Sequence, residues 1–268
     1  SRENIFENAT WLTFGKLRAS YGIAGSDLIG DYQFLNTYGI TPQKYDNTIA
    51  LYPIKLFNPD FSWEKTKKAE IALELEFLKG RIATSVAYFH NQSSNQLVGI
   101  PLPGTTGFNS VQANLNATVE NTAWEFTLRT QNIKKEFFSW STDINLSIPR
   151  NKLVAFQNLE ESTYANQYVI GEPITIKKVF NFLGVDSETG LYKFEDLNND
   201  GIINDEDRKT VANIGVKYFG GINNNISYKN WSVDFLWQFV KQNNYNSDYY
   251  FNTIGDMSNR EKRALDYC

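Results

Sequence analysis

Residues 69–91 read AEIALELEFLKGRIATSVAYFHN, and this stretch decides the class of fold. Apolar side chains recur at alternate positions on both sides of Lys79-Gly80, from Ile71 to Phe77 and again from Ile82 to Tyr88. Alternation of this kind is typical of β-strands that have one apolar and one polar face. Glycine tolerates the positive φ of a tight turn, so the stretch predicts two antiparallel strands joined by a two-residue hairpin at Lys79-Gly80.

The same alternation recurs along the rest of the chain. Each run is about 10 residues long, roughly twice the average strand of a globular protein and enough for a tilted strand to cross a bilayer. Amphipathic aromatic residues stand at the strand ends, where an interfacial girdle would place them: Trp11, Tyr88, Trp140, Tyr228 and Trp231. The predicted strands are 11–23, 69–78, 81–91, 110–131, 137–148, 217–228 and 231–241, with a further strand near 169–183.

The predicted connections alternate between short and long. Tight turns are expected at Lys79-Gly80, at 132–136 and at Lys229-Asn230, whereas the connections over about 24–68, 92–109 and 149–216 are long. Membrane barrels have short periplasmic turns and long outer loops, so all three lysine-bearing turns should fall on one side. The apolar positions of 110–131 change from odd to even numbers, which predicts a β-bulge near Asn121.

Composition excludes several classes of protein. The 268 residues carry a net charge of -4 and lack a basic cluster, which argues against nucleic acid as a partner. No apolar run approaches the roughly 20 residues of a spanning helix, and the single cysteine, Cys268, provides neither a disulfide framework nor a CxxC metal site. We therefore predict an all-β fold, an antiparallel transmembrane β-barrel fragment with about seven long strands. The alternative is a secreted β-sandwich that binds glycans and carries a structural calcium loop.

Five local motifs, in this order, resemble the SusC/RagA family of TonB-dependent outer-membrane transporters. They are LRASYG at 17–22, NPDFSWEKT at 58–66, LPGTTGF at 102–108, DLNNDG at 196–201 followed by DEDR at 205–208, and FGGINN at 219–224. The resemblance implies that the chain is the later part of a plugged barrel of roughly 22 strands.

The resemblance also implies a function, a location and partners. The function is TonB-dependent import of oligosaccharides or peptides across the cell outer membrane, so the chain is not expected to be an enzyme. Its partners would be a SusD-like surface lipoprotein, the TonB complex, the transported substrate and outer-membrane lipid. The chain opens Ser1-Arg2-Glu3-Asn4, so we expect residues 1–268 to be a partial barrel domain that lacks the signal peptide, the plug and the final strands.

The region 196–207 has the spacing of a calcium-binding loop. Oxygen ligands stand at loop positions 1, 3, 5, 9 and 12, Gly201 at position 6 permits the sharp turn, and position 7 offers a backbone carbonyl. An Asp replaces the usual Glu at position 12, and a solvated acidic turn is the alternative interpretation. The predicted metal ligands, for a structural Ca²⁺, are Asp196, Asn198, Asp200, Ile202, Asn204 and Asp207.

The other candidates for catalysis or binding are acidic residues on the polar faces of strands, one histidine and a few aromatic residues in loops. Glycosidases need two carboxylates that converge across a cleft, and nothing in the sequence pairs Glu74, Glu76, Asp143 or Asp234 in that way. We expect these acids to line a lumen and to be balanced by Arg18 and Arg129, and we expect the single histidine, His90, to have no catalytic role. Aromatic rings beside amides can stack on a sugar, although packing on neighbouring loops is the simpler interpretation. The candidate ligand-binding residues are Phe108, Tyr245, Tyr249 and Tyr250.

Overall fold

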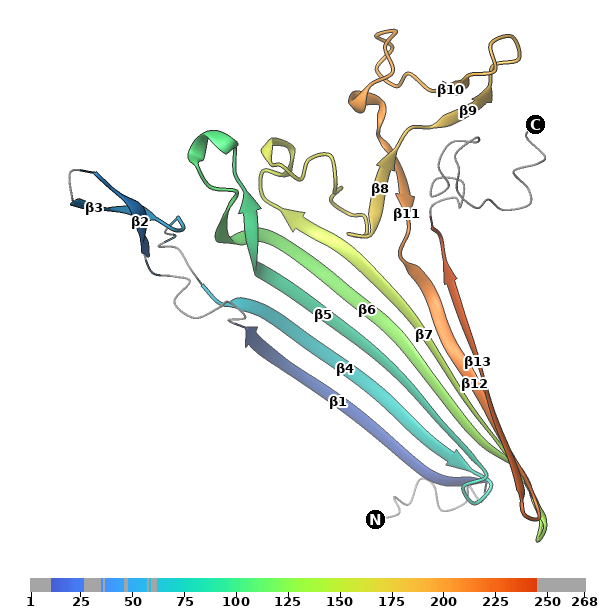
Figure 1. The fold of residues 1–268 in the computed structure, drawn as a ribbon. Helices are drawn as coiled ribbons and strands as arrows, with labels where there is room; N and C mark the ends of the chain where they lie inside the picture. Colours follow the sequence, from blue (N-terminus) through green and yellow to red (C-terminus); the bar gives the residue numbers. More distant parts are fainter. Residues whose placement is uncertain are drawn as a thin grey trace.

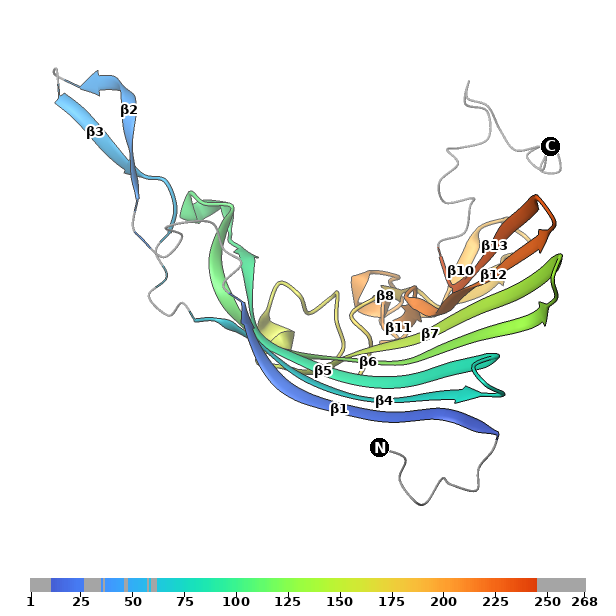
Figure 2. The ribbon, with the colours of Figure 1, turned by 90° about the horizontal axis from the view of Figure 1, so that it is seen from below.

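A computed structural model describes residues 11–26, 35, 37–45, 48–56, 58 and 62–244. Its main element is a seven-stranded antiparallel sheet in the order β1-β4-β5-β6-β7-β12-β13, which is bowed rather than flat (Figures 1 and 2). Among the described residues, no helix is long and apolar enough to cross a membrane. The strands are β1 (Leu12–Ser26), β4 (Glu64–Phe77), β5 (Ile82–Pro101), β6 (Ser110–Lys134), β7 (Phe138–Phe156), β12 (Val216–Tyr228) and β13 (Trp231–Gln242).

All seven predicted long strands are confirmed, but several are longer than predicted. β5 has 20 residues, β6 has 25 and β7 has 19. The added residues lie beyond the apolar alternation, as in the polar stretch from Asn91 to Asn95 of β5. Backbone hydrogen bonds continue a ladder whether or not its side chains alternate, so hydrophobic pattern alone misses such extensions.

The strand register separates side chains into two faces. The face that we call apolar carries a row of paired residues across the whole sheet: Leu17, Leu73, Val86, Phe126, Leu146, Gly220 and Phe239. The neighbouring row lies on the face that we call polar: Lys16, Glu74, Ser85, Thr127, Asn145, Gly221 and Gln238. Because alternate residues point to opposite sides of a sheet, this register gives each face one chemical character.

The apolar face is uncovered. Leu73 is 41% exposed and Phe235 is 37% exposed, although a soluble sheet would bury such residues against a second layer. The other described sheets are two-stranded and belong to the long connections: β2 (Tyr38–Tyr45) with β3 (Thr48–Pro53), β8 (Ile176–Val179) with β11 (Thr210–Asn213), and β9 (Phe182–Val185) with β10 (Tyr192–Phe194). The β-sandwich alternative is therefore not what the described residues form.

The three tight turns lie at one end of the sheet, as predicted (Figure 1). Tyr228 pairs with Trp231, so Lys229-Asn230 forms the predicted two-residue hairpin, with Lys229 at a φ of 52°. The predicted turn at Lys79-Gly80 is confirmed in position: the Arg81 N–H donates to the Leu78 carbonyl at 3.4 Å around these two residues, and both have positive φ. The strand ladder itself ends one pair earlier, at Phe77 and Ile82. The strand predicted near 169–183 is confirmed in part by the four-residue β8.

The β-bulge predicted near Asn121 is displaced, because the extra residue of β6 lies between Leu115 and Thr118, opposite Ser94–Gln96 of β5. Asn121 lies in a regular part of the ladder, between Asn91 of β5 and Asn151 of β7. The register shifts of β6 lie elsewhere: opposite Ser94–Gln96 of β5, at Thr118/Val119 and at Gln131/Ile133 against β7.

Burial explains why the apolar positions of β6 change parity without a bulge at Asn121. Val119 and Arg129 lie on the same polar face, because the ladder between them is regular. Val119 is nevertheless buried, since the chain after β7 folds over this part of the sheet. The buried cluster consists of Ala117, Val119, Leu153, Phe156 and Leu159, with Leu115, Tyr164 and Tyr168 packed against it. The apolar residues therefore mark two different environments, one on each face.

Gly220 is a close-packed point of the sheet and supports a prediction. A Cβ at this position would overlap the carbonyl oxygen of Asn145 and lie 2.7 Å from Cζ of Phe239. We expect Gly220→Ala to destabilise the full-length protein by about 1–3 kcal/mol, the usual cost of overpacking. Gly22→Ala is the matched control, because a Cβ on Gly22 in β1 meets nothing within 4 Å. The measurement is gel electrophoresis of samples heated to a series of temperatures and loaded without boiling, in which folded and unfolded protein migrate as separate bands. The temperature at which half of the protein is unfolded should fall for Gly220→Ala only, and equal midpoints for the two variants would contradict the packing argument.

Candidate functional site

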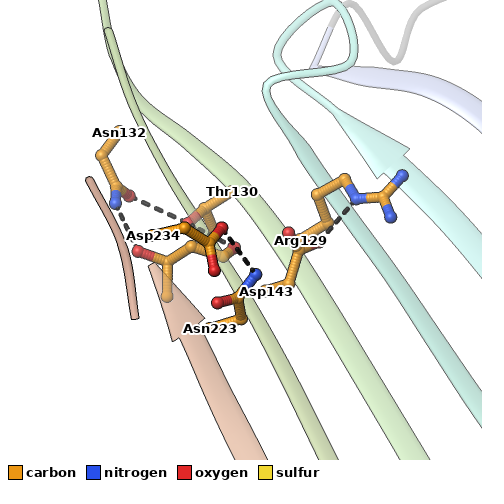
Figure 3. A network of polar contacts seen from close by, with 7 residues as sticks. Arg129, Thr130, Asn132, Asp143, Asn223 and Asp234 are labelled. Atoms are coloured by element: carbon orange, nitrogen blue, oxygen red, sulfur yellow. Dashed lines mark hydrogen bonds and ion pairs between the residues drawn. The ribbon is translucent and has the colours of Figure 1, made fainter. Parts of the chain in front are cut away.

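The polar face carries ion pairs between neighbouring strands. The Arg18 guanidinium lies 2.8 Å from the Glu74 carboxylate and 3.7 Å from that of Glu70. Arg129 donates to Asp143 at 2.6 Å (Figure 3). The prediction that Arg18 and Arg129 balance the acids of this face is confirmed for Glu74 and Asp143. The Arg129 side chain is 78% exposed, so such a pair contributes at most about 1 kcal/mol and its main effect is to neutralise charge.

Amides provide the remaining partners on the polar face. The Asp234 carboxylate of β13 accepts hydrogen bonds from the side chains of Asn223 at 3.5 Å and Asn225 at 3.3 Å (Figure 3). A groove on this face is lined by residues of β1, β4, β5, β6 and β7, including Phe14, Glu74 and Asp143. Away from the buried cluster around Val119, the polar face is thus a wet surface of amides, hydroxyls and charged groups.

A second polar cluster, which the sequence did not reveal, lies on the apolar face near the tight turns. Thr142 donates to the Asn224 side chain at 2.8 Å, as does the Trp140 indole at 3.0 Å. Asn132 links this group to Thr130, with hydrogen bonds of 2.7 Å to Thr142 and 2.9 Å from Thr130 (Figure 3). Asn132 is the extra residue at the Gln131/Ile133 shift, and no alternation pattern marks it.

The acidic loop between β10 and β11 is closed by its own hydrogen bonds. The carboxylate of Asp207, fully buried at 0% exposure, accepts the backbone N–H of Leu197 at 2.8 Å and that of Asn204 at 3.0 Å. The bond from Asn204 has the largest effect, and together these bonds lower the pKa of Asp207 although burial acts in the opposite direction. Asp196 accepts the amides of Gly201 at 2.7 Å and Asp200 at 3.3 Å.

This hydrogen bonding bears on the predicted calcium site. Both carboxylate oxygens of Asp207 already face backbone donors, and Asn204 caps the 3₁₀ turn Asp205–Asp207 through the Glu206 amide. In the described part of the chain, no three His, Cys, Asp or Glu side chains gather as a group that could hold a metal ion. The predicted set also includes amide oxygens and the Ile202 carbonyl, so calcium binding stays a prediction. Bound calcium would stiffen the loop without supplying chemistry.

The candidate ligand-binding residues are only partly described. Phe108 is half-buried and follows the 3₁₀ turn Gly104–Thr106, whose Thr106 hydroxyl donates to the Phe108 carbonyl at 3.1 Å. Tyr245, Tyr249 and Tyr250 lie outside the described residues. His90 contacts Glu120 at 3.0 Å and has no catalytic partners in the described strands.

The β9–β10 hairpin is an exposed apolar feature that sequence reasoning missed. Its large exposed side chains include Leu183 at 61%, Leu191 at 68% and Tyr192 at 70%. Lys193 lies 2.7 Å from Asp186 and, with the amides of Thr189 and Glu188, lowers the pKa of Asp186 to about 2. The hairpin therefore presents apolar residues on a well-defined turn at the end of the molecule opposite the tight turns (Figure 1).

Long antiparallel strands, an uncovered apolar face and a wet polar face define the wall of a membrane-spanning β-barrel. The family model for "TonB dependent receptor-like, beta-barrel" proteins matches residues 8–263, and the chain belongs to this family. The resemblance to SusC/RagA transporters is thereby confirmed.

Curated relatives and solved structures agree with this assignment. TonB-dependent receptor P26 of Formosa agariphila is 29% identical over 94% of the chain, and TonB-dependent receptor SusC of Bacteroides thetaiotaomicron is 23% identical over 98%. The structure of the RagAB peptide transporter matches 88% of the chain with a TM-score of 0.74 at 20% identity, which shows the fold alone. The chain spans 28% of the length of each of these proteins.

The buried carboxylate of Asp207 supports a prediction about the loop. Asn at this position cannot accept at both side-chain atoms, so Asp207→Asn should speed hydrogen exchange at the amides of Leu197 and Asn204. The matched control is Asp205→Asn, because the Asp205 side chain is exposed and lies 3.3 Å from Arg208.

The same loop should respond to pH in one direction. A lowered folded-state pKa gives stability that is present above the unfolded Asp value of about 3.9 and is lost as pH falls through the folded value. Hydrogen exchange at the amides of Leu197 and Asn204, after correction for the intrinsic pH dependence of amide exchange, should therefore accelerate only below about pH 4. Unchanged protection in Asp207→Asn would contradict the role of this carboxylate.

Calcium binding is checked by isothermal titration calorimetry of the full-length protein in detergent. The loop spacing predicts binding heat at up to about millimolar calcium, the range of weak extracellular sites. This heat should disappear in Asp196→Asn and persist in Asp186→Asn, which removes a carboxylate from the neighbouring hairpin. Absence of heat from the unmodified protein would end the calcium hypothesis.

Proposed function

We propose that the chain forms part of the wall and outer loops of an outer-membrane importer of oligosaccharides or peptides, energised by the TonB complex. The observation that carries the proposal is the separation of the sheet into an exposed apolar face and a hydrated polar face. A sheet with this pattern is stable when the first face contacts hydrocarbon and the second lines a lumen. Membership of the TonB-dependent receptor family supports this placement.

The peptide class is supported by a solved relative, since RagAB is described as a peptide transporter. The oligosaccharide class rests on the resemblance of the motifs to the SusC/RagA family. The polar face suits either cargo, since amides and hydroxyls form hydrogen bonds with both sugars and peptide groups. Arg18 and Arg129 on this face are each paired with a carboxylate, so these charges are neutralised within the wall.

A SusD-like surface lipoprotein is the proposed partner at the outer end. The exposed apolar side chains of the β9–β10 hairpin support this part of the proposal, because contiguous exposed apolar residues commonly mark contact sites. We assign the chain no catalytic role. Glu74 and Asp143 are each paired with an arginine, whereas hydrolytic carboxylates must converge on a substrate.

Two neighbouring arginine substitutions in β5 test the placement of the wall. Val86 lies on the apolar face opposite Leu73 and Phe126, and Ser85 lies on the polar face. In the full-length protein, we expect Val86→Arg to cost about 2–4 kcal/mol in the bilayer and to reduce the folded band in outer-membrane fractions. Ser85→Arg should assemble like the unmodified protein. Equal assembly of the two variants would contradict contact between the apolar face and lipid.

Growth assays complete the test of import. A strain lacking the gene should lose growth on either oligosaccharides or peptides as the sole carbon source. The unmodified gene and Ser85→Arg should restore growth, and Val86→Arg should restore it less well. Undiminished growth of the deletion strain on both nutrients would contradict the proposed function.

A further inference from the structure

Beyond the apolar rows, the apolar face changes to a belt of cations. The register aligns Ile23, Lys67, Gln92, Glu120 and Lys152 in one row across β1, β4, β5, β6 and β7. Lys65, two residues before Lys67 in β4, lies on the same face. Arg150 of β7 and Lys241 of β13 also lie on this face. We call Lys65, Lys67, Arg150, Lys152 and Lys241 the cationic belt.

The belt lies where the apolar rows end, away from the tight turns. Between Phe77 and Lys67, β4 advances about 33 Å at roughly 3.3 Å per residue. A strand tilted by about 40° rises about 25 Å over that length, the height of the apolar band of outer-membrane barrels. The last apolar rows also contain the contacting rings of Tyr88 and Trp124, with centroids 4.9 Å apart, as expected of an interfacial girdle.

The charge of the belt is not balanced by the sheet itself. Within the described part of the chain, Lys65, Lys67 and Lys152 form no ion pair, and all three are exposed. Across the described strands, the acid that shares this face and these rows is Glu120, which contacts His90. The opposite face differs, because there Arg18 and Arg129 are each matched with a carboxylate.

Arg150 is a structural member of the belt. One of its guanidinium nitrogens donates to the backbone carbonyl of Lys217 at 2.8 Å, which ties β7 to the start of β12. The four lysines of the belt that form no ion pair among the described residues, Lys65, Lys67, Lys152 and Lys241, are therefore the residues free to meet an external anion. They stand at the margin of a surface that the proposed function places in hydrocarbon, so the nearest external groups are lipid headgroups.

We infer that the cationic belt binds the phosphate groups of lipid headgroups at the outer margin of the membrane. The inference rests on the proposed function for the location of the apolar face. Lysine ammonium groups attract phosphate as compact charges, and a low-dielectric surface beside them strengthens the attraction. The belt fixes the height of the barrel in the membrane and selects phosphorylated lipids as its immediate neighbours.

The test uses the full-length protein in a neutral detergent, with native mass spectrometry to measure lipid binding. The probes are a diphosphorylated glucosamine lipid and the same lipid after removal of its phosphates. The unmodified protein should prefer the phosphorylated lipid. This preference should shrink when the salt concentration rises from about 50 to about 500 mM, because the Debye length falls from roughly 10 Å near 0.1 M towards roughly 3 Å near 1 M. This salt comparison needs no variant.

A triple variant, Lys65→Gln, Lys67→Gln and Lys152→Gln, tests the residues. Each cation near an anionic surface contributes about fivefold in affinity, so we expect a loss on the order of tenfold to a hundredfold for the phosphorylated lipid only. The matched control is Lys16→Gln, Lys68→Gln and Lys79→Gln, which removes the same charge from the polar face and a tight turn. The control should bind like the unmodified protein.

The outcomes separate this inference from the proposed function. Equal binding of both lipids by a folded, membrane-inserted protein would overturn the inference and leave the importer intact. Equal loss in the triple variant and its control would also overturn it, because net charge alone would then explain binding. A protein that never inserts into membranes, judged by the folded band in outer-membrane fractions, would overturn both.

Discussion

Backbone hydrogen bonding is the constraint on which the rest of the structure depends. Hydrocarbon offers no partner for an N–H or C=O group, so a strand that crosses it must be paired along its length. The ladders from β1 to β13 meet this demand across seven strands. Once the ladder is fixed, each side chain is assigned to one face by its position along the strand. The separation of apolar from polar residues is therefore a consequence of register, and a slip of one residue would invert it.

How far the sequence predicts this fold depends on what each residue contacts. Leu73, Val86 and Phe126 face one environment over many rows, so their alternation predicts strands and faces correctly. Val119 breaks the pattern because the chain after β7, which contributes Leu159 to the same cluster, buries it on the polar face. No local signal distinguishes that burial from a change of face, and the sequence therefore predicts a bulge where the ladder is regular.

Polar residues limit prediction of the site in a different way. Arg18 and Glu74 lie 56 positions apart in the chain, yet the face to which each belongs follows from alternation. Their pairing could therefore be expected. The cluster of Asn132, Thr142 and Asn224 could not be expected, because it depends on a register shift that brings Asn132 of β6 to Thr142 of β7, which in turn donates to Asn224 of β12. The acidic loop is intermediate: its spacing is visible, but the use of Asp207 as a buried acceptor for two amides is a property of the folded loop.

The two edge strands of the sheet have backbone groups without partners in the described sheet. Every residue of β13 is exposed, as are most residues of β1, and each edge strand presents one side of its backbone without a partner in the described sheet. Edge strands of soluble proteins are tolerated because water pairs with these groups, but on the proposed location the apolar face at both edges contacts hydrocarbon. Phe235, Trp237 and Phe239 continue the apolar rows to the very edge, so the edge is not designed to meet water. On that location both edges would require further strands in the membrane, and the sheet is bowed as the wall of a barrel would be (Figure 2).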